Sequence, residues 1–230
     1  MEATVTVIGA GRMGKIIARQ LPEETRKIII DQKLQRAEEL ASAIDGIAST
    51  DIGAAQEADL FFIVVPASEV NAVVEQICRV ARKGAVIVNM ATSVNINEQT
   101  KNDKHFLNFV EGKIIGQASA MEQGEPGILV VDTVDRAIYR LIKSQLPMFK
   151  GICQGNPDLV PYINTVAVNA GLRAAVQASQ ELTLKGIPED WLKTALKTIC
   201  AGTVKAYAED DLGPFARELA NKLTENNSNR

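Results

Sequence analysis

A glycine-containing stretch near the start of the chain, TVTVIGAGRMGKIIARQL at Thr4–Leu21, restricts the possible folds more than any other feature. β-Favouring residues fill Thr4–Ile8, and Gly9, Gly11 and Gly14 follow at the spacing GxGxxG. Apolar residues at helical spacing come directly after the glycines. This order predicts a strand, a tight turn and a helix, in which the glycines let the backbone approach a pyrophosphate and the helix N-terminus favours an anion.

A second apolar run, Ile28–Ile30, ends at Asp31, 20 residues beyond Gly11. An acidic side chain at this distance is placed to accept hydrogen bonds from an adenosine ribose. The strand, the glycines, the helix and the acid together predict a dinucleotide site, and the alternative is a glycine-rich turn with a surface aspartate. The residues expected to bind the cofactor in this stretch are Gly9, Gly11, Arg12, Met13, Gly14 and Asp31.

The identity of the dinucleotide depends on the charge beside the ribose. The carboxylate of Asp31 favours a free 2′-hydroxyl and repels a 2′-phosphate, which favours NAD. Lys33 and Arg36 follow closely, and either is able to approach a phosphate. The sequence therefore predicts NAD or NADP, with NAD preferred.

The apolar runs that follow alternate with helical patterns. The run LFFIVV at Leu60–Val65 is continuous and short, which suits a parallel strand covered on both faces. The fold class expected is α/β, a doubly wound and mostly parallel Rossmann sheet, with the ligand crevice at the carboxyl ends of the strands. Val65, Pro66, Ala67 and Ser93 follow such ends and are therefore expected at the cofactor; helix capping is the alternative role of Ser93.

The pattern changes after Gly155, because no strand signal follows it. We expect a dinucleotide-binding domain at 1–155 and a helical substrate and dimerisation domain at 156–230. Three helices are predicted in the second domain, at 158–185, 189–209 and 215–223, followed by a frayed polar end. A small helical unit with this much apolar surface is marginal alone, so we expect it to pack on the first domain and to form a homodimer.

Candidate catalytic residues lie on the long predicted helix. Asn164 shares a row with small or apolar residues, so its amide is expected to be buried or to face a cleft, with either the protein or a ligand as partner. Tyr162 and Thr165 are candidate proton donors; a bound water and the substrate itself are the alternatives. His105 is flanked by charged residues and is expected at the surface. The polar loop 119–127 is either a lid or a solvated loop.

Composition excludes several partners. The net charge of −3 gives no attraction to nucleic acid or to anionic membrane, and aromatic residues at 4% leave few stacking platforms. Cys78, Cys153 and Cys200 are widely spaced, which predicts buried free thiols in a reducing compartment and no metal site. The chain has neither an export-type leader nor about 18 consecutive apolar residues, so the expected location is the cytoplasm.

The order of elements resembles the superfamily of pyrroline-5-carboxylate reductases, coenzyme-F420-dependent NADP oxidoreductases and β-hydroxyacid dehydrogenases. VIGAGRMG is similar to the first strand and turn of this superfamily, IVVPAS to the end of its fourth strand, and VNMATSV to the next strand end. The resemblance implies hydride transfer with NAD(P)H to or from a small imine, keto or hydroxy substrate. The alternatives are a sensor that binds NAD(H) without turnover and an F420-dependent NADP reductase.

Overall fold

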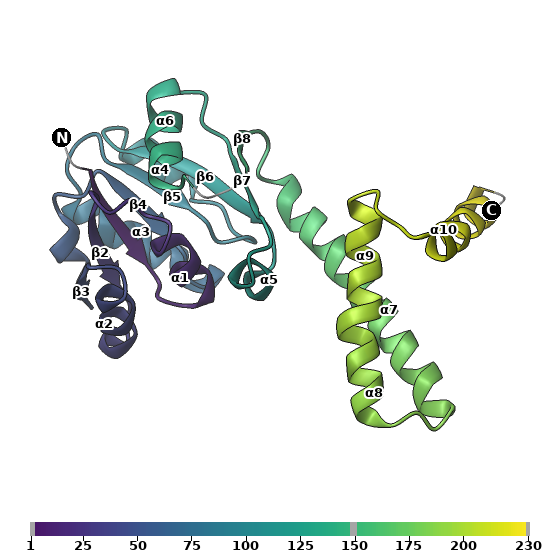
Figure 1. Cartoon of the computed structure of the whole chain (residues 1–230). Helices are drawn as coiled ribbons and strands as arrows, with labels where there is room; N and C mark the ends of the chain where they lie inside the picture. The colour runs from purple at the N-terminus through teal and green to yellow at the C-terminus, as the bar shows by residue number, and fades with distance from the viewer. Residues whose placement is uncertain (1–2, 148–150, 229–230) are drawn as a thin grey trace. The chain divides into compact units, whose positions relative to one another are not determined.

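The computed structural model describes residues 3–147 and 151–228. The chain packs into two compact units, which divide between Asn164 and Thr165 (Figure 1). This division falls inside one long helix, α7 (Leu159–Leu184), which begins in the first unit and ends in the second. The boundary expected after Gly155 stays a prediction.

The first unit contains one sheet with the strand order β3-β2-β1-β4-β5-β6-β7-β8. All neighbouring strands are parallel except β6 and β7. This arrangement confirms the predicted α/β fold class. The strands are β1 (Thr4–Ile8), β2 (Arg26–Ile30), β3 (Ile47–Ser49), β4 (Leu60–Ile63), β5 (Val86–Asn89), β6 (Asn108–Ile115), β7 (Ile128–Val131) and β8 (Gly151–Gln154).

Helices cover both faces of this sheet because the central strands are apolar on both sides. In β4, Phe62 belongs to a core that includes α1, α2 and α6, whereas Phe61 and Ile63 belong to a second core with η1 and α3. Burying each such side chain contributes about 1.5–3 kcal/mol. The helical elements of this unit are α1 (Arg12–Ala18), α2 (Leu34–Ser42), η1 (Ile52–Ala55), η2 (Ala67–Glu69), α3 (Val70–Val80), α4 (Glu98–Asp103), α5 (Ala118–Glu122) and α6 (Arg136–Gln145).

The second unit is helical, as predicted. After α7 it contains α8 (Glu189–Thr194), the π-helical segment η3 (Ala195–Cys200), α9 (Ala201–Ala208) and α10 (Pro214–Ser228). The expectation that the polar end after residue 223 is frayed was wrong as far as Ser228, because α10 continues to that residue. Glu218 and Lys222 form an i,i+4 ion pair in the part of α10 that precedes this end.

The structure also settles segments whose sequence is less clear. Residues 95–112 are polar and show no clear periodicity, and they contain α4 and most of β6. The sequence predicts a short extended piece near Phe149–Cys153; its first two residues lie outside the described residues, and β8 begins at Gly151. All three cysteines are free. The prediction that they are buried holds for Cys78 and was wrong for Cys153, which is exposed on β8, whereas Cys200 is partly exposed. Among the residues that the structure describes, no helix combines the length and apolarity needed to cross a membrane.

Candidate cofactor site

The turn after β1 is built so closely that two of its glycines cannot be replaced. Gly9 has a φ of +105°, and its N–H donates to the carbonyl of Ile30 over 2.7 Å. A Cβ on Gly9 would overlap the carbonyl of Val64, and a Cβ on Gly14 would overlap the carbonyl of Gly9. A Cβ on Gly11 would meet nothing within 4 Å. Gly9 and Gly14 therefore bring β1, β4 and α1 together, whereas Gly11 faces open space.

The carboxylate of Asp31 connects this turn to the end of β2. One oxygen, Oδ2, accepts the N–H of Ala10 over 2.8 Å, and Oδ1 accepts the N–H of Lys33 over 2.9 Å. Hydrogen bonds from N–H groups to an ionised acceptor are among the stronger ones in proteins. Asp31 therefore fixes the glycine turn and the start of α2 relative to each other.

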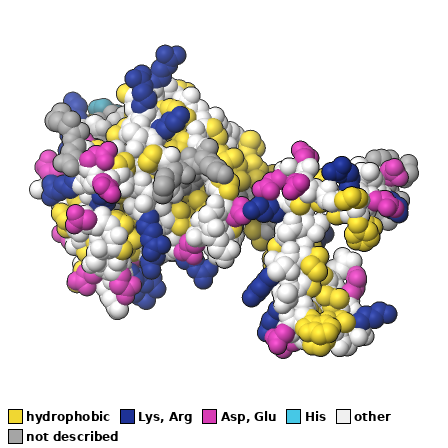
Figure 2. All heavy atoms as spheres, viewed as in Figure 1, with side chains coloured by type: hydrophobic (Ala, Val, Ile, Leu, Met, Phe, Trp, Pro, Cys, Tyr) yellow, Lys and Arg dark blue, Asp and Glu magenta, His cyan; other side chains and the backbone are white. Residues whose placement is uncertain are grey.

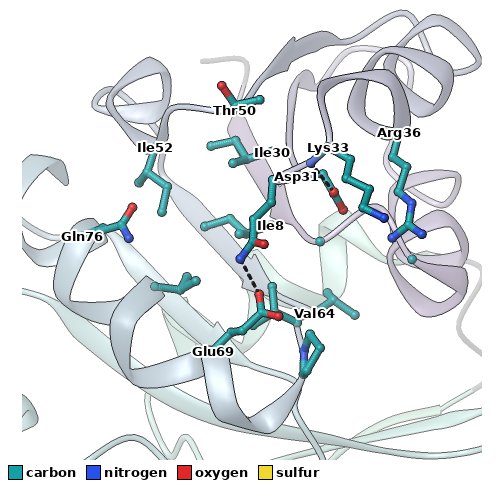
Figure 3. A pocket seen from close by; sticks show the side chains of 16 residues that line it. Ile8, Ile30, Asp31, Lys33, Arg36, Thr50, Ile52, Val64, Glu69 and Gln76 are labelled. Atoms are coloured by element: carbon teal, nitrogen blue, oxygen red, sulfur yellow. Dashed lines mark hydrogen bonds between the residues drawn. The ribbon is translucent and has the colours of Figure 1, made fainter.

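A cavity of about 380 Å³ lies beside Asp31, at the carboxyl ends of β1, β2 and β4. Figure 3 shows Lys33 and Arg36 together at one end of this cavity, with Ile52 and Gln76 at the other. The residues lining the cavity are Ile8, Gly9, Gly11, Ile30, Asp31, Gln32, Lys33, Arg36, Thr50, Ile52, Val64, Val65, Pro66, Glu69, Val73 and Gln76. Apolar walls and a few polar groups around a crevice of this size are typical of a cofactor site.

The structure brings only part of the predicted cofactor set to this cavity. Gly9, Gly11, Asp31, Val65 and Pro66 line it. The other predicted residues lie outside its lining: Arg12 and Ala67 are exposed, Met13 is half-buried against the core, Gly14 is buried, and Ser93 is exposed beyond β5. The cofactor roles of these residues stay predictions.

Sequence reasoning missed several lining residues. Gln32 follows β2 and donates through Nε2 to Glu69 Oε2 over 2.9 Å, and both residues line the cavity. Thr50 follows β3, and Val73 and Gln76 lie on α3. The rule that ligands bind beyond strand ends was sufficient to find Gln32 and Thr50.

Two of the candidate catalytic residues lie on the part of α7 that belongs to the first unit. The amide of Asn164 donates through Nδ2 to the carbonyl of Ile114, in β6, over 2.9 Å. The sequence left open whether the protein or a ligand bonds this amide, and the structure shows a bond to the protein. Tyr162 is 72% exposed, and Thr165, the next unit's first residue, is also exposed. Their catalytic roles stay predictions.

The geometry of the cavity fits a dinucleotide. Gly11 provides an open approach to the backbone, Asp31 lies at the end of β2, and the neighbouring apolar walls suit a planar base. Gly9 and Gly14 leave no room for side chains in the turn itself. The open backbone at Gly11 and the apolar cavity are therefore compatible with a pyrophosphate at the turn and an adenosine in the cavity.

Comparison with known proteins agrees with this geometry. Residues 4–93 match a family model described as NADP oxidoreductase, coenzyme F420-dependent. The match covers β1 to β5 and the loop after them, which is less than half of the chain. It therefore includes the candidate cofactor site and leaves α7 and the rest of the helical unit outside.

Solved structures extend the similarity over most of the chain. A pyrroline-5-carboxylate reductase from Coxiella burnetii is 13% identical, with a TM-score of 0.73 and coverage of 97% of this chain and 85% of that one. A 3-hydroxyisobutyrate dehydrogenase from Salmonella typhimurium is 19% identical, with a TM-score of 0.64 and coverage of 93% and 81%. An imine reductase variant from Myxococcus stipitatus, in complex with NAD+, is 20% identical, with a TM-score of 0.60 and coverage of 91% and 74%.

These findings confirm the predicted resemblance to this superfamily. The family match supports a general oxidoreductase role, and it supports NAD or NADP as the cofactor. At these identities the structural neighbours establish a shared fold, and they do not identify the substrate.

Proposed function

We propose that the protein is an NAD(P)-dependent oxidoreductase that transfers a hydride between the nicotinamide and a small imine, keto or hydroxy substrate. The proposal rests on the cavity beside the Gly9–Gly14 turn and Asp31. This cavity lies where the order of the strands in the sheet reverses, with β2 on one side of β1 and β4 on the other, and dinucleotides bind at such a point. The nicotinamide supplies the hydride chemistry, and the protein binds, orients and excludes water.

The test is a titration with NADPH and NADH followed by turnover with a panel of acceptors. We expect saturable binding of at least one reduced cofactor, and its oxidation by at least one cyclic imine, keto acid or aldehyde. Loss of absorbance at the reduced-nicotinamide band measures turnover. Tight binding without turnover across the panel would instead support the sensor alternative.

A second candidate activity is the F420-dependent reduction or oxidation of NADP, and it is supported by the description of the matched family model. A deazaflavin would then exchange a hydride with the nicotinamide of NADP whose adenosine half occupies this cavity. Adding the oxidised deazaflavin F420 to the NADPH assay tests this candidate. Because the match ends at residue 93, it carries no information about the second substrate's binding surface.

We propose that the cofactor is NADP, in contrast to the preference for NAD that the sequence predicts when Asp31 is weighed against Lys33 and Arg36. Both oxygens of Asp31 already accept backbone N–H groups. Lys33 and Arg36 line the same cavity with exposed side chains. Two cations beside one internally bonded carboxylate suit a 2′-phosphate, which an arginine binds with two parallel hydrogen bonds.

We expect the variant Arg36→Ser to bind NADPH about 10- to 100-fold more weakly, because a hydrogen bond to a charged group contributes about 1.5–3 kcal/mol. NADH binding is expected to stay within twofold. Fluorescence titration with both cofactors measures the two affinities. Arg26→Ser, at the opposite end of β2, is the matched control. Equal losses for NADPH and NADH would contradict the assignment of Arg36 to the 2′-phosphate.

We also propose that the helical unit forms a homodimer. Among the described residues from 165 to 225, none is buried, and many large apolar side chains are exposed (Figure 2). An apolar groove of about 650 Å³ lies between α9 and α10, lined among others by Tyr207, Phe215 and Leu219. A second copy of the same unit would supply a matching apolar surface. In a dimer with a twofold axis the same patch of each copy forms the interface, so this one apolar surface would be covered in both.

Sedimentation at micromolar concentration is expected to give twice the mass of the 24.8 kDa chain. Leu219→Glu introduces a charge into the groove and is expected to shift the species to the monomer. Lys222→Gln, on the same helix but outside the groove lining, is expected to stay dimeric. A wild-type protein that sediments only as a monomer would contradict the proposal.

A further inference from the structure

Three polar side chains are buried together where β5 ends beside β6. Asn89 is the last residue of β5, and its register partner in β6 is Glu111. Lys113 lies two residues further along β6, so it projects on the same face as Glu111. Their exposed fractions are 0%, 3% and 1% for Asn89, Glu111 and Lys113. This lysine–glutamate–asparagine network plays no part in the cavity beside Asp31.

The ammonium of Lys113 is fully bonded. Its Nζ donates to the carbonyls of Ala91 and Val94 over 2.6 and 2.7 Å, and to Glu111 Oε2 over 2.9 Å. An ammonium has three N–H donors, so each donor has an acceptor. Two of the three acceptors, the carbonyls of Ala91 and Val94, belong to the loop that follows β5. Lys113 therefore bonds this loop at two points.

Glu111 and Asn89 hold the same loop at further points. Glu111 Oε1 accepts the N–H of Ile96 over 2.6 Å, and Oε2 accepts Asn89 Nδ2 over 2.7 Å. Asn89 also donates through Nδ2 to the carbonyl of Val94 over 2.8 Å and accepts the N–H of Ala91 through Oδ1 over 3.1 Å. The network thus bonds backbone groups of Ala91, Val94 and Ile96.

Burial makes this arrangement costly unless it remains paired. Desolvation lowers the pKa of Lys113, and the hydrogen bond from Lys113 to Glu111 opposes that effect. Asp132, whose Oδ1 accepts the N–H of Glu111, has its pKa raised by burial. Apolar side chains of similar size often give a more stable core than a buried ion pair. The network is therefore better explained by the loop shape that it imposes than by stability.

The loop that it shapes presents two hydroxyl side chains to solvent. Ala91 and Ile96 are buried, whereas Thr92 and Ser93 between them are exposed. Because β5 is parallel to β4 and β1, the loop lies at the same sheet edge as the glycine turn and the cavity. The nicotinamide half of a dinucleotide bound at the turn would extend along this edge towards β5.

We propose that Lys113, through Glu111 and Asn89, is a positioning residue that holds the loop Ala91–Ile96 in the shape that binds the nicotinamide half of the cofactor. This inference rests on the proposed function. Lys113 acts through the backbone of the loop, which offers the hydroxyls of Thr92 and Ser93 to the carboxamide. The adenosine half, bound beside Asp31, does not depend on the network.

The test compares a whole cofactor with a fragment that has only the adenosine half. We expect Lys113→Met to weaken NADPH binding by about 10- to 100-fold, because the loop 91–96 would have to be ordered when the cofactor binds, and that ordering lowers affinity. Binding of 2′,5′-ADP is expected to stay within twofold. Lys27→Met is the matched control, because Lys27 is also buried but lies near the amino end of β2 and bonds the carbonyl of Glu23. This control is expected to change neither affinity.

Two further measurements keep the test decisive if Lys113→Met folds poorly. The double variant Glu111→Gln/Lys113→Met removes both charges together and is expected to lose NADPH affinity selectively. In the wild-type chain, NADPH is expected to slow amide hydrogen exchange at 91–96, and 2′,5′-ADP is not. Unchanged exchange at 91–96 with NADPH, or equal losses of both ligands in a folded variant, overturns the positioning role. A wild-type chain that binds neither ligand overturns the proposed function instead.

Discussion

Gly11→Val is expected to lower the affinity for NADPH by at least about 100-fold, equivalent to about 2.7 kcal/mol, while the chain stays folded. A Cβ on Gly11 meets nothing within 4 Å, and Gly11 has a φ of −73°, which any residue adopts. The valine side chain would occupy the space through which a pyrophosphate approaches the turn. Fluorescence titration measures the affinity, and thermal unfolding followed by circular dichroism verifies the fold.

The matched control for Gly11→Val is Gly213→Val. Gly213 also has no atom within 4 Å of an added Cβ, but it lies before α10, outside the cofactor cavity. This variant is expected to keep the wild-type affinity. Wild-type affinity in a folded Gly11→Val protein would contradict the placement of the dinucleotide at this turn.

Gly14→Ala is expected to destabilise the first unit by about 3 kcal/mol or more, the upper range for adding a methyl group to a packed site. Its Cβ would overlap the backbone carbonyl of Gly9, and Gly9 is itself held against the carbonyl of Val64. Neither carbonyl belongs to a flexible side chain, so relief requires that α1 move away from β1. Helix α1 contributes the buried residues Ile17 and Ala18 to the core, which opposes that movement.

Urea unfolding measures this second effect through the shift of its midpoint. Gly11→Ala, three residues away in the same turn, is expected to leave the midpoint unchanged, because its Cβ enters open space. An unchanged midpoint for Gly14→Ala would show that the helix and the strand are less closely packed than this geometry requires. Within one motif, Gly11 is therefore expected to matter for cofactor binding and Gly14 for the stability of the fold.

The dinucleotide motif and its sheet were predictable because their signals are local. The strand at Thr4–Ile8, the three glycines and Asp31 occur in one segment with fixed spacing, and the family that they indicate has the observed fold. The apolar run that contains β4 was equally clear, because a strand buried on both faces has no polar position.

The first six residues of strand β6, 108–113, were not predictable from a local pattern, because two of them are charged. Glu111 and Lys113 are charged, so the stretch NFVEGKII lacks the pattern of a buried strand. Their pairing with each other and with Asn89 depends on the register between β5 and β6, which no local pattern specifies. The partner of Asn164 was likewise out of reach, because the carbonyl of Ile114 lies 50 residues away in the chain.

The absence of buried side chains among residues 165–225 affects what a thermal measurement on this chain would mean. The first unit carries two apolar cores of its own, so its melting temperature is expected not to depend on protein concentration. If the helical unit is covered by a second copy, its unfolding also depends on protein concentration, through mass action. One melting temperature would then describe only one of the two units, and dilution would separate the two unfolding transitions.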